Sequence, residues 1–142
     1  MSATVVNLQR KIPLDLKSFY SFLNTSLKLI EEAKGKYAAV AFVSDHRMIE
    51  LNKLFRQKDS TTDVLSFPHE PDEFDPDESN MGDIVISTEQ AARQADENGL
   101  NIEIEIKQLI LHGLLHLCGY DHETDSGEMN RRELELRDKL GI

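Results

Sequence analysis

Three histidines in the C-terminal part of the chain have the residue type and the spacing of metal ligands. They are His112, His116 and His122, within the segment HGLLHLCGYDH. On a helix, residues four apart are neighbours on one face, with Cβ atoms about 5–6 Å apart. The imidazoles of His112 and His116 can therefore bind one ion. For this pair alone, two core histidines with local hydrogen bonds are a reasonable alternative.

The third histidine favours a metal site. If the helix continued, His122 would lie about 9 Å along the axis from His116 and be rotated by about 240°. Gly119 lies between them, and glycine readily adopts the left-handed conformation that ends helices. The pattern HxxxHxxGxxH therefore predicts two ligands on a helix, a chain reversal, and a third ligand on the same ion.

Three neutral imidazoles would leave a fourth coordination position for water, which is typical of catalytic zinc. A bound metal can lower the pKa of that water to about 7. One Zn²⁺ is the first expectation, although histidine ligands also suit other divalent transition metals such as nickel, cobalt, iron or copper. The residue after His112 is Gly113, where metalloproteases of the H-E-x-x-H type have a glutamate as general base. Peptide hydrolysis by that route is therefore disfavoured.

The hydrophobic pattern predicts the elements that position these histidines. Strands are expected at residues 4–8, 37–43, 63–68 and 83–86, and helices at about 14–35, 44–56, 87–98, 102–118 and 127–140. The helix at 102–118 is apolar nearly all round, so we expect it to be central and buried. Because the helices do not alternate regularly with the strands, the predicted fold class is α+β.

Length and composition predict one domain spanning residues 1–142. The single cysteine, Cys118, cannot form an internal disulfide, and nothing else indicates an oxidising compartment. The N-terminal segment lacks the apolar stretch of a secretory signal, and no run approaches the roughly 20 apolar residues that span a bilayer. We therefore expect a cytoplasmic protein without a membrane partner.

The net charge of −10 weakens the case for a nucleic-acid partner without excluding one. Acidic residues are concentrated at 70–78, where the segment EPDEFDPDE holds six carboxylates, while Lys53, Arg56 and Lys58 lie close together. A guanidinium suits a phosphodiester, whose negative charge grows during cleavage, and this makes Arg56 a candidate phosphate ligand. Alternatively, Arg56 and Lys58 only complement the C-terminal end of their helix.

The segment HGLLHLCGYDH, together with LNKLFRQKDSTTDVLSFP (51–68) and GDIVIS (82–87), resembles the YbeY endoribonuclease family. These are bacterial proteins of ribosomal RNA maturation and ribosome quality control. The resemblance covers residues 44–142 in order. It implies a zincin-like α+β fold, in which a small mixed sheet of about four strands packs with helices around a central histidine-bearing helix.

The same resemblance implies one zinc ion and cleavage of single-stranded RNA at the 3′ end of the small-subunit ribosomal RNA. It places the metal ligands at His112, His116 and His122, and the functionally important arginine at Arg56. We assign catalytic roles to Arg56, His112 and His116. The expected partners are single-stranded or ribosomal RNA and the ribosome or its proteins, and no DNA is expected.

Two other functions remain as alternatives: a metallopeptidase-like hydrolase that recruits its base from outside the helix, and a non-catalytic ribosome assembly factor with a structural metal. Near the third histidine, Asp121 either orients a histidine, accepts a proton or only forms a turn. We expect Asp83 to be structural, His46 and His69 to be solvated, and Cys118 to be a packed core thiol.

Overall fold

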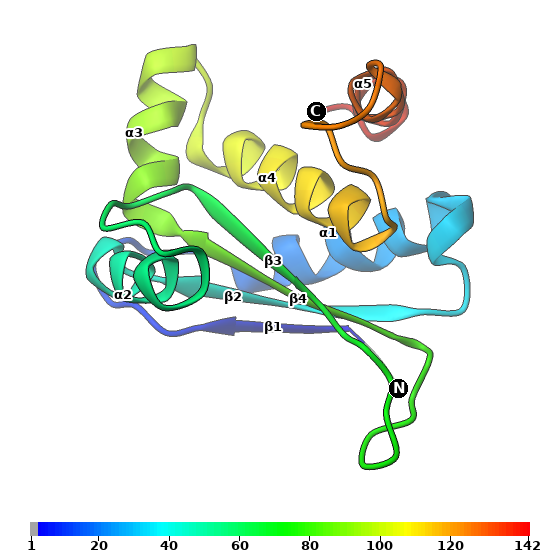
Figure 1. The fold of residues 1–142 in the computed structure, drawn as a ribbon. Helices are drawn as coiled ribbons and strands as arrows, with labels where there is room; N and C mark the ends of the chain where they lie inside the picture. Colours follow the sequence, from blue (N-terminus) through cyan, green and yellow to red (C-terminus); the bar gives the residue numbers. More distant parts are fainter. Residues whose placement is uncertain (1–2) are drawn as a thin grey trace.

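The computed structural model describes residues 3–142 as a four-stranded sheet with helices on both faces (Figure 1). The strands are β1 (Thr4–Asn7), β2 (Tyr37–Val43), β3 (Val64–Pro68) and β4 (Asn80–Ser87). The helices are α1 (Leu16–Leu29), α2 (Asp45–Arg56), α3 (Thr88–Asn98), α4 (Ile102–Leu117) and α5 (Glu128–Leu140), with a short 3₁₀ helix η1 (Glu31–Ala33). The α+β class predicted from the sequence is confirmed.

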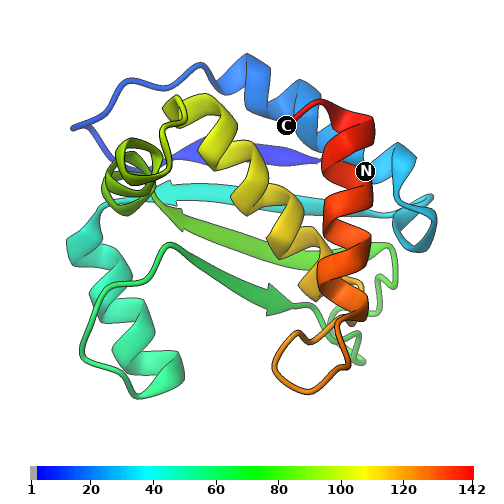
Figure 2. The same cartoon turned by 90° about the horizontal axis from the view of Figure 1, so that it is seen from above.

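The sheet is mixed, with the strand order β1-β2-β4-β3. Strands β1, β2 and β4 run parallel to one another, while β3 runs antiparallel to β4 and forms one edge of the sheet (Figure 2). Successive side chains alternate between the two faces. Ile84 and Ile86 of β4 therefore pack into the main core, whereas Val85 packs with Met48 of α2 on the opposite face.

Helix α4 is the central element of the main core. It runs over the middle of the sheet, with α1 on the side of β1 and α5 crossing near its C-terminal end (Figure 2). Ile106, Ile110 and Leu114 of this helix are fully buried, and they pack with residues of α1 such as Leu23. Despite this apolar character, no helix within residues 3–142 is both long and apolar enough to cross a membrane.

Gly113 lets α4 approach the sheet closely. A Cβ atom at this position would lie 2.8 Å from Cγ2 of Ile84 in β4, too close for a real contact. The Ser66 hydroxyl of β3 donates a hydrogen bond of 3.5 Å to the carbonyl oxygen of Gly113. The residues on either side of Gly113 are thereby held beside the β3 edge of the sheet.

Two element boundaries differ from the sequence prediction by three or more residues. The first helix ends at Leu29 rather than near Gly35, because Ile30 turns to an extended conformation and both it and Ala33 enter the core. Strand β4 begins at Asn80 rather than at residue 83, since its early residues pair with β2 and β3. In both places tertiary packing overrides the local pattern.

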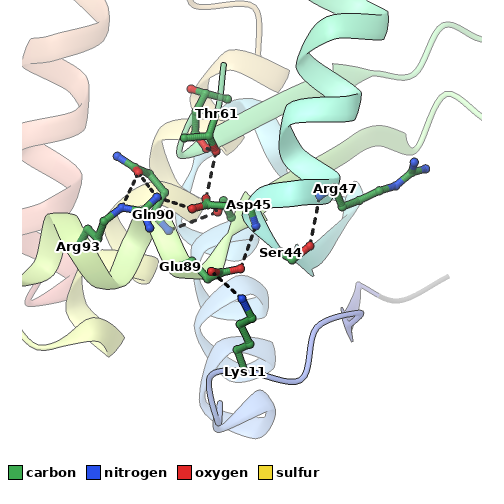
Figure 3. Close-up of polar contacts among 10 residues, drawn as sticks. Lys11, Ser44, Asp45, Arg47, Thr61, Glu89, Gln90 and Arg93 are labelled. Carbon is green, nitrogen blue, oxygen red and sulfur yellow. Dashed lines mark hydrogen bonds and ion pairs between the residues drawn. The ribbon is translucent and has the colours of Figure 1, made fainter. Parts of the chain in front are cut away.

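Asp45, the first residue of α2, ties three segments together (Figure 3). Its carboxylate accepts hydrogen bonds from Ser87 Oγ (2.6 Å), Thr61 Oγ1 (3.1 Å) and the Arg93 guanidinium. Its backbone N–H donates to the Glu89 carboxylate at 3.1 Å. Burial raises the pKa of Asp45, but these hydrogen bonds outweigh burial and hold the pKa below its usual range. The network joins the N-termini of α2 and α3 to the turn that contains Thr61.

We expect Asp45→Asn to lower the free energy of unfolding by about 2 kcal/mol at pH 7, because the charged acceptor of several hydrogen bonds is lost. A carboxyl whose pKa is depressed by folding stabilises the protein above its unfolded pKa of about 3.9. The difference between variant and wild type should therefore shrink as the pH falls below that value, through the lowered pKa of the folded state. Urea unfolding of both proteins, from pH 7 to below about pH 3.9, measures this difference in the free energy of unfolding.

Asp59→Asn is the matched control, because Asp59 is an exposed carboxylate on the same α2–β3 connection. It should change the free energy of unfolding little at any pH. A loss for Asp45→Asn that did not depend on pH would contradict the assigned role of the ionised carboxylate.

Candidate metal centre

Three imidazoles meet at the C-terminal end of α4. His112 and His116 lie one turn apart on this helix, which ends at Leu117, and Gly119 then reverses the chain with a φ of 102°. One ring nitrogen from each of His112, His116 and His122 lies within 4.8 Å of the others. The chain reversal at Gly119 that the spacing predicts is thus confirmed, and the three side chains are positioned to bind a metal ion.

The orientation of the rings fits a metal ligand set. The Nδ1 atom of His116 donates to the carbonyl oxygen of Tyr120 (3.1 Å), and the Nδ1 atom of His112 contacts the Glu133 carboxylate (2.6 Å). With Nδ1 engaged in this way, the Nε2 atoms of His112 and His116 face each other at 3.2 Å. Two nitrogens bound tetrahedrally to one Zn²⁺ at 2.0–2.1 Å would lie about 3.3 Å apart.

The protonation state of His116 also favours metal binding. Burial lowers the pKa of His116, and the neighbouring His112 and His122 lower it further. Neutral imidazole is the form that offers a lone pair to a metal. The site therefore keeps His116 in the form that can act as a ligand.

Glu133 of α5 forms a second layer behind His112, which sequence reasoning missed. Its side chain is buried, and its carboxylate also pairs with the Arg137 guanidinium one turn further along α5. Burial raises the pKa of Glu133, but the hydrogen bond with His112 and the charge of Arg137 outweigh it, so the pKa lies below its usual range. A negative charge is thus held against Nδ1 of His112, an arrangement that orients metal-binding histidines in other proteins.

Tyr120 fixes the chain reversal and was also missed. Its carbonyl oxygen holds His116, while its hydroxyl donates to the Glu32 carboxylate of η1 at 2.7 Å. Glu32 in turn pairs with Arg132 of α5 at 3.4 Å. The turn that carries His122 is therefore anchored to two other elements. No pattern in the sequence connects these residues, since 88 positions separate Tyr120 from Glu32.

The histidines lie in a cleft of about 610 Å³ that also contains Arg56. One wall is formed by the C-terminal end of α2 and the turn after it, including Arg56 and Lys58, and another by β3. Within residues 3–142, no carboxylate forms an ion pair with either Arg56 or Lys58. The structure therefore brings Arg56 into the same cavity as the three histidines, with its charge available to an anion.

The cleft is not a basic channel. Three acidic side chains, Asp63, Asp121 and Glu123, line it together with the two cations. Two of them have local partners: Asp63 accepts from Gln94 Nε2 (3.0 Å), and Asp121 accepts from the backbone N–H of Glu123 (3.0 Å). The hydrogen bond that Asp121 accepts from the Glu123 N–H is a turn interaction, one of the three roles that the sequence suggests for Asp121. A dication at the histidines would shift the balance of charge in the cleft toward positive.

The remaining residues considered from the sequence lie outside the cleft. His46 is exposed, as expected, and Asp83 is an exposed residue of β4. The expectation that His69 is solvated was wrong: only 17% of its side chain is exposed, because its backbone continues the pairing with β4 and its ring lies beside Asp75. Cys118 packs against the core, and burial raises its pKa to about 11, as expected for an unreactive thiol.

Comparison with known proteins points to one family. The profile of the family described as endoribonuclease YbeY matches residues 4–141 of this chain. Endoribonuclease YbeY of Nautilia profundicola is 43% identical over 132 residues, which cover 92% of each chain. The protein of the same name from Carboxydothermus hydrogenoformans is 38% identical over 142 residues, covering 97% of this chain and 96% of the other.

A solved structure has the same fold. The solution structure of a Thermotoga maritima protein superimposes with a TM-score of 0.65 at 26% sequence identity. The match covers 97% of this chain and 88% of that protein. The similarity therefore extends over nearly the whole chain, including the first forty residues, where the sequence motifs gave only a general pattern.

We expect Glu133→Gln to weaken Zn²⁺ binding about tenfold, because removing a carboxylate behind a metal-binding histidine typically costs 10- to 100-fold in affinity. Competition with a chromophoric chelator measures the dissociation constant. Glu135→Gln is the matched control, since Glu135 is an exposed residue of the same helix whose ion-pair partners within residues 3–142 are Arg132 and Lys139. Equal affinities for the two variants would rule out this role for Glu133.

Proposed function

The chain belongs to the endoribonuclease YbeY family, and on that premise we propose that it is a metal-dependent endoribonuclease that cleaves single-stranded RNA. We further propose that it acts in the cytoplasm, as a single domain, on the 3′ end of the small-subunit ribosomal RNA, with the ribosome as its partner. The observation that carries this function is the cleft that holds Arg56 and the three histidines together.

The proposed ligands of the metal are His112, His116 and His122, and Zn²⁺ is the proposed ion. Support comes from the convergence of three ring nitrogens and from the engaged Nδ1 atoms of His112 and His116. When bound, the ion would act as a Lewis acid and make a water molecule more acidic. Glu133 and the Tyr120 carbonyl would keep the two helical ligands in the required orientation.

Arg56 is the proposed phosphate ligand. Its guanidinium has no competing carboxylate among residues 3–142 and lines the same cleft as the histidines. A planar fork of N–H donors can hold two phosphate oxygens and stabilise the negative charge that grows on them during cleavage. Lys58, on the same wall, would add a second positive charge along the RNA backbone.

The peptidase alternative is disfavoured by the packing of α4. In metallopeptidases of the H-E-x-x-H type, the general base follows the first histidine. Here that position faces β4, where even a Cβ atom would lie 2.8 Å from Ile84. A side chain that acts as a base therefore has no room at residue 113.

We expect Arg56→Ala to lower kcat/KM for a single-stranded RNA oligonucleotide by about 100-fold, the usual effect of removing one donor to a developing negative charge. His116→Ala should reduce cleavage to background. Lys53→Ala is the control, because Lys53 lies in the same turn of α2 but does not line the cleft. Undiminished cleavage by both Arg56→Ala and His116→Ala, measured by gel electrophoresis of labelled RNA, would refute the proposed roles.

Elemental analysis of the purified protein should find about one divalent ion per chain. We expect chelation to abolish RNA cleavage and one equivalent of Zn²⁺ to restore it, because water activation is lost with the ion. His122→Ala should retain less metal than wild type after dialysis. Full activity of a protein shown to be metal-free would exclude a metal-dependent mechanism.

A further inference from the structure

The outer edge of β3 faces the cleft. The backbone bonds Ser87 N to Asp63 O (2.9 Å) and His69 N to Met81 O (3.0 Å) fix the pairing of the two antiparallel strands. In such a ladder alternate residues bond to the partner strand, and the groups between them point away. The backbone N–H and C=O groups at residues 64, 66 and 68 therefore point away from β4, and all three residues line the cleft.

Among the described residues, this edge has one N–H group without an acceptor. The N–H of Val64 donates to Oδ1 of Asp63 at 2.8 Å, and Pro68 has no N–H. The N–H of Ser66 has no acceptor among residues 3–142. Carbonyl oxygens of the outward-facing residues flank this donor along the strand. One N–H donor with acceptors beside it therefore points away from β4, on a strand that lines the same cleft as the histidines.

We propose that this edge of β3 binds an unpaired nucleobase of the RNA substrate, with the Ser66 N–H donating to the base and a neighbouring carbonyl accepting from it. The inference rests on the proposed function. Proteins recognise the bases of single-stranded RNA through hydrogen bonds to their free Watson–Crick edges. In a duplex these edges are occupied, so the β3 edge selects single-stranded RNA without any side chain that reads the sequence.

The groups along the edge favour a base over other ligands. A phosphate would be repelled by the carbonyl oxygens on both sides of the Ser66 N–H, and its positive partners, Arg56 and Lys58, come from α2 and the turn after it. An extended peptide that added a strand to the sheet would need N–H donors from alternate residues of β3. Two of the three such positions have no donor to offer.

Ser66→Pro tests the proposal, because it removes the N–H that points away from the sheet and leaves the bonds to β4 in place. Proline is tolerated at such positions of edge strands. Ser66→Ala is the matched control, since it loses the hydroxyl contact to Gly113 but keeps the N–H. We expect kcat/KM for single-stranded RNA to be about tenfold lower for Ser66→Pro than for Ser66→Ala, the effect of one lost hydrogen bond.

A set of RNA oligonucleotides, each with one abasic position, locates the base. For one oligonucleotide of the set, the missing base should lower the kcat/KM of Ser66→Ala. The same missing base should leave the kcat/KM of Ser66→Pro at its value for the complete RNA. Equal kcat/KM values for the two variants, with normal cleavage by wild type, would overturn the proposal while leaving the proposed function intact. Failure of wild type to cleave RNA would instead refute the proposed function. The alternative ligand of this edge is an unstructured peptide. If such a peptide inhibited RNA cleavage by Ser66→Ala but not by Ser66→Pro, the edge would be a peptide site and the proposal would be overturned.

Circular dichroism and metal content test whether Ser66→Pro is folded. If it is not, the Ser66 amide resonance of ¹⁵N-labelled Arg56→Ala protein provides the test, because this variant should cleave RNA slowly. We expect intact RNA to shift this resonance, and RNA that lacks the located base to leave it unchanged. Identical shifts with both RNAs would contradict base recognition by β3.

Discussion

The close contact between α4 and the sheet at Gly113 is the constraint on which the rest of the site depends. A Cβ atom at this position would lie 2.8 Å from Cγ2 of Ile84, so with any residue other than glycine the helix or Ile84 would have to shift. His112 immediately precedes this contact, and the Ser66 hydroxyl of β3 reaches the Gly113 carbonyl. The close approach of α4 to β4 at Gly113 thus places His112 beside the sheet.

The candidate site combines local and long-range structure. The three histidines come from one helix and the turn that follows it, so their arrangement depends mainly on backbone geometry at Gly119. Arg56 comes from α2, a helix that packs on the opposite face of the sheet and reaches the cleft past the β3 edge. Its position depends on the whole sheet and on the polar network of Asp45, which holds the start of α2.

These two origins explain what the sequence could predict. Within residues 3–142, local sequence patterns located the four strands and the five α-helices, although α4 was assigned by its length and acidic first turn because its isoleucines alternate as in a strand. The positive φ that glycine permits predicted the reversal at Gly119. The pairing of Glu133 with His112 and of the Tyr120 hydroxyl with Glu32 was not predictable, because these partners are 21 and 88 positions apart in the sequence. The solvated environment expected for His69 was wrong because β3 pairing continues past its proline, which local composition does not indicate.

The histidine cluster spans a short stretch of chain, and this bears on the entropy cost of bringing its three rings together. Closing a loop of so few residues removes little conformational entropy from the chain. Glu133 and the Tyr120 carbonyl already hold two of the rings, and the Tyr120 hydroxyl anchors the turn to η1. Two of the three proposed ligands are thus oriented by hydrogen bonds within the protein. In zinc fingers folding and metal uptake are one event, whereas the main hydrophobic core of this domain contains none of the three histidines.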